Sequence, residues 1–241
     1  MPTPSAARST TRSRLRQRRT VITIDGPSGV GKSTVAKMLA DRLRLQYLDT
    51  GATYRALACQ ALRHGIDPRD DAAVARLGAR LRLTLSPGAQ GRCKVALDGE
   101  DVTREIRLEP VTEAAAIIAQ FPTVRAVMVR LQQRMARGRS VVAEGRDTGS
   151  VVFPRATHKF FLDADMRIRA RRRHAELVSL RAGSPTVGKI QRQLASRDHL
   201  DRSRRVGPLM QPPGSTRIDT TSLTASQVVA RILSSIRSDG K

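Results

Sequence analysis

A glycine-rich loop between an apolar strand and a helix constrains the fold of this chain more than any other feature. The loop, residues 26–34, reads GPSGVGKST and satisfies the pattern G-x-x-x-x-G-K-[ST]. An apolar, β-branched run precedes it at residues 20–25, and Val35 and Leu39 belong to a helical pattern that follows. Glycines let successive backbone N–H groups turn inward around phosphate oxygens, and a helix N-terminus adds unpaired N–H groups. The sequence therefore predicts a nucleoside triphosphate site.

Two residues of the loop have specific predicted roles. Lys32 is expected to reach the β- and γ-phosphates, and the Ser33 hydroxyl is expected to bind a Mg²⁺ ion that bridges them. The loop alone does not distinguish kinases from GTPases, motor ATPases or transporters. The residues predicted to bind ATP are Gly26, Pro27, Ser28, Gly29, Val30, Gly31, Lys32, Ser33 and Thr34.

Polar residues follow two further strand-like runs. Thr50 and Arg55 come after the first run, and Arg146 and Asp147 come after the second, at residues 140–144. Because the carboxyl ends of parallel strands line the ligand crevice of an open sheet, we expect all four beside the loop.

Each of these positions also has a structural interpretation. Arg55 can clamp a second phosphate, or it can be the solvated arginine of a turn. Arg146 and Asp147 can form a structural ion pair, or Arg146 can bind phosphate while Asp147 binds a neutral or amino-bearing part of an acceptor. The run RDHLDRSRR at residues 197–205 can be a solvated face, or a flexible segment whose arginines close over the transferred phosphoryl group and exclude water.

Strand-like and helical segments alternate along the chain, which favours an α/β fold with a parallel sheet. From about residue 68 to 108 the pattern alternates with period two, which indicates a small antiparallel insertion. A capping box of Thr224 and Gln227 is expected to open the last helix. The other predicted elements are strands at 46–48, 159–163 and 217–220, a helix with Leu57 and Leu62 on its apolar face, a helical stretch at about 109–137 interrupted at Pro122, and a basic helical region at 167–205 broken near 183–185.

The charge of the chain points to polyanionic partners. It carries 44 Lys and Arg against 21 Asp and Glu, a net charge of +23, and the candidates are nucleic acid, anionic lipid and phosphorylated small molecules. Six of its arginines lie in residues 1–20, where there is no acidic residue. This segment is expected to be a solvated disordered tail, with organelle targeting and a loose RNA contact as alternatives.

The sequence does not favour a membrane protein, a disulfide-rich protein, a two-carboxylate hydrolase or a metalloprotein. No apolar run reaches the roughly 18 residues of a membrane span, and Cys59 and Cys93 are too few for a disulfide framework, so the chain is expected to be soluble and reduced. The carboxylates of Asp49, Glu144 and Asp147 do not resemble the pair of a hydrolase. The histidines form no metal-ligand pattern with the cysteines; they are His64, His158, His174 and His199.

Together these residues resemble the bacterial cytidylate kinases, a family of nucleoside monophosphate kinases. The similarity spans roughly residues 20–237, and its most specific part is the Gly-Arg-Asp segment followed by Val-Val-Phe-Pro. The matching segments are IDGPSGVGKST at 24–34, LDTGATYR at 48–55, GRDTGSVVFP at 145–154, FLDA at 161–164, and the basic run with Arg197, Asp198, Asp201 and Arg204.

The resemblance implies a nucleoside-monophosphate-kinase fold. Such a fold has a five-stranded parallel sheet with helices on both faces, a small antiparallel insertion that binds the monophosphate, and a short lid. The implied boundaries are a basic disordered tail at 1–19, a kinase domain at 20–237 with its insertion at about 68–125 and its lid at about 182–204, and a second tail at 238–241. The resemblance further implies a cytoplasmic monomer without membrane contact or a specific nucleic-acid partner.

The implied activity is transfer of the γ-phosphoryl group of ATP to CMP or dCMP, with Mg²⁺, in pyrimidine nucleotide metabolism. The attacking group is then an ionised phosphate oxygen, so no strong general base is needed. By position in the family motifs, Asp147 and Asp201 would face the sugar, whereas Arg55, Arg146 and Arg197 would face the phosphates. The residues implied in catalysis are Lys32, Arg146, Arg197 and Arg204, and those implied in acceptor binding are Thr50, Arg55, Arg125, Arg146, Asp147 and Asp201.

Three departures from the family pattern concern specificity. Ala116 stands where the family has a serine that contacts the base, and Leu108, followed by Pro110, stands where the family has a threonine. Residues 214–215, Gly-Ser, replace an Asp-Ala pair. One lost polar contact to a base edge costs about 1–3 kcal/mol of discrimination. Two alternatives therefore stay open: a kinase of shifted acceptor specificity, and a nucleotide- or RNA-binding protein without catalytic activity.

Overall fold

The computed structural model describes residues 19–88, 93–179 and 185–238. Several predictions from the sequence fall wholly or partly outside these ranges: the N-terminal tail, part of the insertion at about 68–125, the helix break near 183–185, the first residues of the lid, and the C-terminal tail.

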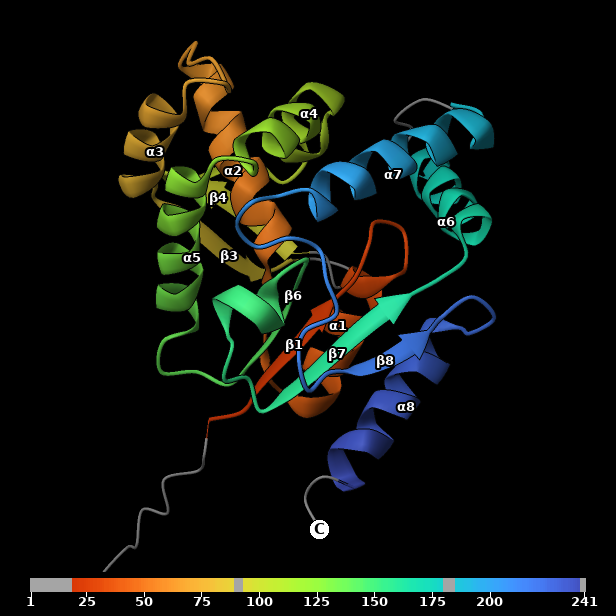
Figure 1. The fold of residues 1–241 in the computed structure, drawn as a ribbon. Coiled ribbons are helices and arrows are strands. Elements are labelled where there is room, and N and C mark those ends of the chain that lie inside the picture. Colours follow the sequence, from red (N-terminus) through yellow and green to blue (C-terminus); the bar gives the residue numbers. More distant parts are fainter. Residues whose placement is uncertain (1–18, 89–92, 180–184, 239–241) are drawn as a thin grey trace, which may run out of the picture.

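A five-stranded parallel sheet forms the base of the molecule (Figure 1). Its strands follow the order β2-β6-β1-β7-β8, and every neighbouring pair is parallel, which confirms the predicted α/β class. The register aligns Asp25 with Gly145 and Asp49 with Glu144, so the ends of three strands form one polar row. The strands are β1 (Val21–Asp25), β2 (Gln46–Asp49), β6 (Val141–Gly145), β7 (His158–Asp163) and β8 (Thr216–Asp219).

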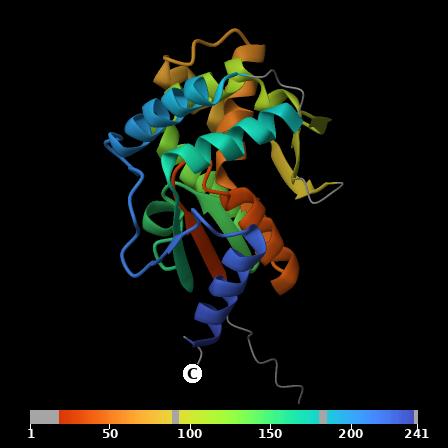
Figure 2. The ribbon, with the colours of Figure 1, turned by 90° about the vertical axis from the view of Figure 1, so that its right-hand side faces the viewer.

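Helices cover both faces of this sheet (Figures 1 and 2). On one face, α1 (Lys32–Leu43) and α8 (Ala225–Ser238) bury the alternate residues Ile22 and Ile24 of β1 together with Phe160 of β7. The opposite face carries Val141 and Ala143 of β6, which pack near the C-terminal end of α5 (Pro122–Ala136). The period-two alternation of the buried strands thus divides the core into two layers.

A second apolar core lies above the sheet, where α5 joins α2 (Thr50–Arg63), α3 (Asp71–Ala79) and α4 (Glu109–Ile118). Helix α3 was not predicted from the sequence. The Asp70 side chain caps it by accepting a hydrogen bond from Ala73 N at 2.9 Å. The predicted antiparallel sheet follows it, with strands β3 (Leu83–Pro87), β4 (Cys93–Leu97) and β5 (Glu100–Asp101).

Two details of this upper part test predictions from the sequence. Pro122 is the first residue of α5, and α4 and α5 meet there at a bend of 105°, so the predicted interruption is confirmed. Leu62 does not share the buried face of α2 with Leu57: it is 39% exposed, whereas Leu57 is fully buried. A short 3₁₀ turn, η2 (Glu105–Arg107), leads into α4.

The basic helical region forms two packed helices, α6 (Met166–Ser179) and α7 (Val187–Arg202), whose contact buries Ala170 and Ile190. A π-helical turn, η3 (Thr148–Val152), follows β6. The predicted capping box before α8 is confirmed, because Thr224 N donates to Gln227 Oε1 at 2.9 Å and Gln227 N donates to Thr224 Oγ1 at 3.3 Å.

No single helix within the described ranges is long and apolar enough to cross a membrane. The one helix pair that reaches this length and composition, α4 with α5, is the pair bent by 105°.

Leu108 precedes α4 without capping it. The residue occupies the N-cap position in an extended conformation, makes no side-chain cap, and is 56% exposed. A threonine hydroxyl in this place can accept a hydrogen bond from an unpaired N–H of the first turn. We therefore expect Leu108→Thr to raise the free energy of unfolding by about 1 kcal/mol, as measured by urea denaturation. Leu62→Thr, inside α2, is the control; an equal gain there would show that capping is not the cause.

Candidate active site

The glycine-rich loop lies between β1 and α1 and has the backbone that its glycines permit. Gly29 and Gly31 adopt φ values of 81° and 94°, in the left-handed region. Gly26, at φ 148°, passes so close to β7 that a Cβ atom there would lie 2.1 Å from the Leu162 carbonyl oxygen. The loop therefore needs glycine at position 26 for packing against the neighbouring strand.

Lys32 is held inside this loop. Its Nζ donates to the Pro27 carbonyl oxygen at 2.7 Å, and the side chain is buried. Burial, and next the positive charge of Arg146, lower the pKa of Lys32 to about 7. Glu144, Asp201 and Asp25 oppose these effects only in part, and a phosphate group beside the ammonium would offset them further.

This pKa predicts a proton linkage to nucleotide binding. Lys32 is mostly neutral above pH 7 in the free protein, and a bound phosphate favours its protonated form, so we expect MgATP binding at pH 8 to take up about one proton. At pH 6 the uptake should vanish, because Lys32 already holds its proton. Titration calorimetry in two buffers of different ionisation enthalpy measures the effect. Lys32→Met should show none, and an unchanged uptake in that variant would contradict the assignment.

Arg146 connects the loop to α7. Its Nη2 donates to Ser28 Oγ at 2.5 Å, and its Nε donates to Asp201 Oδ2 at 2.8 Å. Asp201 also pairs with Arg204 through its other oxygen. Burial alone would raise the pKa of Asp201, but Arg146 and Arg204, with Arg197, hold it below its ordinary value. One carboxylate thus orders two guanidinium groups above the loop.

Arg197 lies in the same group, and no carboxylate among the described residues forms an ion pair with it. Burial, and then the charge of Arg146, lower its pKa to about 10. Its Nε and the Nε atoms of Arg204 and Arg125 are buried, and none has a hydrogen-bond partner among the described residues. Buried guanidinium nitrogens without acceptors are costly unless an anion satisfies them. This cluster therefore fits a polyphosphate ligand.

Asp147 pairs with Arg125 and not with its neighbour Arg146, so the structure rules out an ion pair between these two adjacent residues. Arg125 is 1% exposed, donates to the Ala119 carbonyl oxygen at 3.3 Å, and lies against the Tyr54 ring, 5.7 Å from its centroid. Burial raises the pKa of Asp147, although Arg125 opposes it. The Arg125–Asp147 ion pair thus lies within electrostatic reach of Arg204 and Asp201.

The residues after β2 lie at the same edge. Thr50 Oγ1 donates to the Glu144 carbonyl oxygen at 2.7 Å, which ties the start of α2 to the end of β6. Arg55 Nη2 lies 3.0 Å from Asp49 Oδ2, and Asp49 also caps α2 by accepting from Ala52 N at 2.7 Å. Arg55 is thus a half-buried, paired arginine and not a freely solvated one.

The run at 197–205 is a solvated face only in part, and its closure over a phosphoryl group stays a prediction. Arg202 and Arg205 are exposed, as on a solvated face, whereas Asp198 and Asp201 are buried and Arg197 and Arg204 are half-buried. The inward side chains recur at three- and four-residue steps, so α7 turns one face toward the loop.

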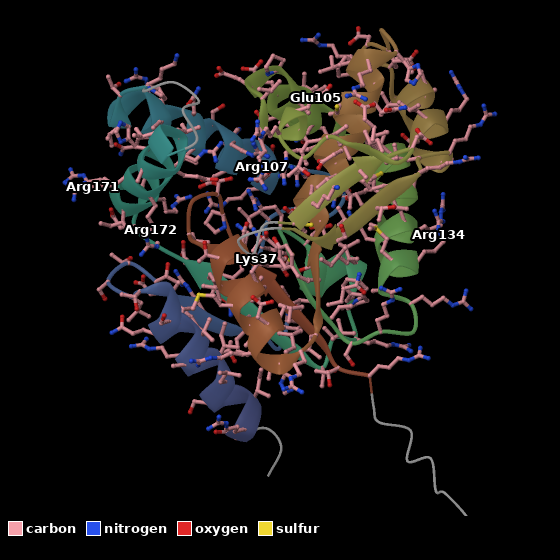
Figure 3. All side chains as sticks on the ribbon, turned by 180° about the vertical axis from the view of Figure 1, so that it is seen from behind. Lys37, Glu105, Arg107, Arg134, Arg171 and Arg172 are labelled. Carbon is pink, nitrogen blue, oxygen red and sulfur yellow. The ribbon has the colours of Figure 1, made fainter. Side chains whose placement is uncertain are left out.

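Two arginines that were not predicted as site residues, Arg169 and Arg172, support the loop from behind. Arg169 Nη1 donates to Ser28 O at 3.2 Å and to Asp198 Oδ2 at 2.5 Å. Arg172, one turn later on α6, donates to the Thr220 carbonyl oxygen at 2.6 Å and lies between α6 and α8, whereas Arg171 extends away from them (Figure 3). The three-residue spacing of Arg169 and Arg172, which puts both on one face of α6, is the sequence feature that could have indicated them.

Asp25, at the end of β1, was also missed as a site residue. Its carboxylate accepts from Thr148 N at 2.8 Å, Thr148 Oγ1 at 2.7 Å and Gly149 N at 2.7 Å, which fixes the turn after Asp147. Burial raises the pKa of Asp25 to about 6, against these hydrogen bonds.

Within the described ranges, no three His, Cys, Asp or Glu residues form a group that could hold a metal ion. Ser33 is exposed in the first turn of α1, directly after the loop. Its hydroxyl is the group of the loop that is expected to bind Mg²⁺ beside the phosphates.

A phosphate-binding loop at the end of a parallel sheet, under converging arginines, defines a P-loop phosphotransferase. The chain belongs to the cytidylate kinase family, whose model, described as "Cytidylate kinase", matches residues 22–238. It is 46% identical over 218 residues to the cytidylate kinase of Geobacillus thermodenitrificans, covering 90% of this chain and 96% of that one. The cytidylate kinase of Pelotomaculum thermopropionicum is 43% identical over 215 residues, 89% of this chain and 95% of its own length.

A solved structure agrees at the level of the fold. An uncharacterized protein from Eubacterium ventriosum superposes with a TM-score of 0.51 at 13% identity, over 92% of this chain and 99% of that one. The family and fold expected from the sequence are thereby confirmed.

Proposed function

We propose that this protein transfers the γ-phosphoryl group of ATP to CMP and dCMP, forming ADP and the nucleoside diphosphate. The observation that carries the proposal is the set of buried, incompletely satisfied arginines facing the phosphate-binding loop. The names of the curated relatives support CMP as the acceptor. We further propose that the protein is a cytoplasmic monomer whose kinase domain spans residues 20–237, with an insertion at about 68–125 and a lid at about 182–204.

Each part of the site has a role in this proposal. The loop backbone, residues 26–34, binds the ATP phosphates, and Lys32 neutralises charge on the transferred group together with Arg146, Arg197 and Arg204. Thr50, Arg55, Arg125, Asp147 and Asp201 bind the acceptor.

The attacking atom is an oxygen of the acceptor phosphate, which is already ionised at neutral pH. The protein therefore needs to align two phosphates and stabilise charge, and it needs no strong general base. Ser33 would hold Mg²⁺, which supplies further neutralisation of the phosphate charge when bound. Because Arg146 contacts both Ser28 of the loop and Asp201 of α7, its position couples the donor side of the site to the acceptor side.

The experiment measures ADP release with ATP and Mg²⁺ against CMP, dCMP, UMP, AMP and GMP at equal concentration. A strong preference for CMP and dCMP is expected. Turnover of a different acceptor would show a shifted specificity, and no turnover with all five would favour a nucleotide-binding protein without catalysis.

A further inference from the structure

The active site does not account for the charge of this chain. The net charge is +23, whereas several of the arginines near the phosphate-binding loop are paired with buried carboxylates. Many exposed arginines lie elsewhere, and their arrangement on the surface decides which polyanion they can attract. One group of them lies at the opposite end of the sheet from the loop.

This group is formed where four neighbouring parallel strands begin. The register aligns the first residues of β2, β6 and β1 with one another, and the second residue of β1 with the first residue of β7. Backbone hydrogen bonds continue this pairing beyond the strands, since Gln46 N donates to the Ser140 carbonyl oxygen at 3.0 Å and Val141 N donates to that of Thr20 at 2.9 Å. Counted along this register, one arginine precedes each strand at the same level. In the strand order β2-β6-β1-β7 these residues, which we call the arginine row, are Arg44, Arg139, Arg19 and Arg155.

The side chains of the arginine row are exposed, and their charge is not neutralised locally. Arg139 Nη1 donates to Gln46 Oε1 at 3.2 Å, so its guanidinium lies at the start of the neighbouring strand β2. Among the described residues, no carboxylate forms an ion pair with any member of the row. Asp41 is the one acidic residue within four positions of a member of the row in the sequence. The row is therefore a local excess of positive charge.

The dimensions of the arginine row fit an extended polyanion. Neighbouring strands lie about 4.8 Å apart, so four of them span about 15 Å. A nucleic-acid duplex carries one negative charge per about 1.7 Å of its axis, so such a span faces several phosphates. Arginine suits this contact, because its planar guanidinium can donate two parallel hydrogen bonds to one phosphate. Arg19 is also joined in the chain to residues 1–18, whose sequence holds five more arginines and no acidic residue.

The surroundings of the row favour a duplex over a single strand or a membrane. None of the tyrosines and phenylalanines is exposed, so none offers a face on which an unpaired base could stack. Insertion into a bilayer needs exposed apolar side chains, and the large ones of the described residues belong to other segments. They are Leu62, Leu108, Val178, Leu200, Val206 and Met210. Phosphates of a duplex backbone, by contrast, can be bound by charge and hydrogen bonds alone.

The arginine row is remote from the phosphate-binding loop. Strand β1 separates Arg19 from Gly26, and β6 separates Arg139 from Arg146, a distance of about 20 Å along extended chain. Figure 1 shows the strands beginning at the lower side of the molecule, whereas α4 and α7 lie at the top. A ligand on the row therefore leaves the nucleotide site free.

We propose that the arginine row is an interaction surface for double-stranded nucleic acid, bound through its phosphate backbone without sequence preference. This inference goes beyond the proposed kinase activity and does not depend on it. Because the contacts are to phosphates, binding releases counterions and its affinity falls steeply with salt. The protein can hold a duplex on the row and nucleotides at the loop at the same time.

The test measures binding of a fluorescently labelled RNA duplex of about 20 base pairs to the full chain, by anisotropy over a range of KCl concentrations. The row variant combines Arg44→Gln, Arg139→Gln and Arg155→Gln. We expect its dissociation constant at 100 mM KCl to rise at least about tenfold over that of the wild type. The plot of log affinity against log salt concentration should become shallower by about two to three, because three phosphate contacts are lost.

The matched control removes the same charge from another place. It combines Arg69→Gln, Arg76→Gln and Arg80→Gln, three exposed arginines in or beside α3. Its affinity for the duplex should stay within about twofold of the wild-type value. The urea midpoints of both variants should match that of the wild type, since all six side chains are exposed.

Equal weakening in the two variants would overturn the assignment, because the net charge and not the row would then determine binding. Displacement of the duplex by saturating MgATP would also overturn it, since the duplex would then occupy the phosphate-binding loop. Tighter binding to phosphatidylserine vesicles than to the duplex would assign the surface to a membrane instead. None of these measurements uses turnover, so failure of the proposed kinase activity would leave the result unchanged.

Discussion

Replacing Lys32 by methionine should lower kcat for CMP phosphorylation by about a thousandfold or more. The side chain is buried within the loop, and among the described residues its ammonium has one acceptor, the Pro27 carbonyl, which leaves donors for phosphate oxygens. Methionine fills a similar volume without charge and leaves the loop backbone in place. Steady-state kinetics with MgATP and CMP measure the loss.

The control for this prediction is Lys159→Met on β7. Lys159 Nζ also donates to a prolyl carbonyl, that of Pro213 at 3.4 Å, but it lies away from the loop. We expect this variant to keep kcat within about twofold of wild type. Retention of more than a tenth of wild-type kcat in Lys32→Met would contradict the role assigned to Lys32.

Loss of Arg146 should lower kcat/KM for the acceptor by about a hundredfold to a thousandfold, and should weaken ATP binding much less. Arg146→Ala removes the contacts to Ser28 and Asp201 together, so the loop and α7 lose the side chain that connects them. Arg146→Lys should remain impaired by at least about tenfold, because one ammonium cannot replace a planar guanidinium that donates from two nitrogens. Initial rates over a matrix of ATP and CMP concentrations separate the two substrates.

A second readout tests the electrostatic part of this prediction. The charge of Arg146 contributes to the low pKa of Lys32, so Arg146→Ala should raise that pKa and reduce the proton uptake on MgATP binding at pH 8. Arg217→Lys is the control, because Arg217 forms an exposed pair with Asp163 at 2.7 Å. Wild-type acceptor kinetics in Arg146→Ala would refute the proposed position of this residue.

The sequence predicted those parts of the fold whose signals are local. The β1–loop–α1 unit, the parallel strands and the capping box of α8 each depend on residues within a few positions of one another. Helix α3 was not predicted, because its nine residues include polar and small ones and adjoin a segment of strand-like alternation. Leu62 was misplaced because an apolar residue in a helix is not necessarily buried.

The sequence predicted which residues belong to the site but not which of them form ion pairs with one another. Motif and resemblance indicated Arg146, Asp147 and Asp201 as separate ligands. Their ion pairs join positions far apart in the chain: Arg146 to Asp201 across 55 residues, and Arg125 to Asp147 across 22. Only the tertiary fold brings such charges together, and the contact of Arg169 with Asp198 behind the loop depends on it in the same way.

Identification of the products formed from ATP and CMP by phosphorus NMR tests the proposed phosphoryl transfer most directly. CDP and ADP should accumulate in equal amounts, with Mg²⁺ present and without release of inorganic phosphate. Formation of ADP and inorganic phosphate with CMP left unchanged, or no consumption of ATP, would contradict it.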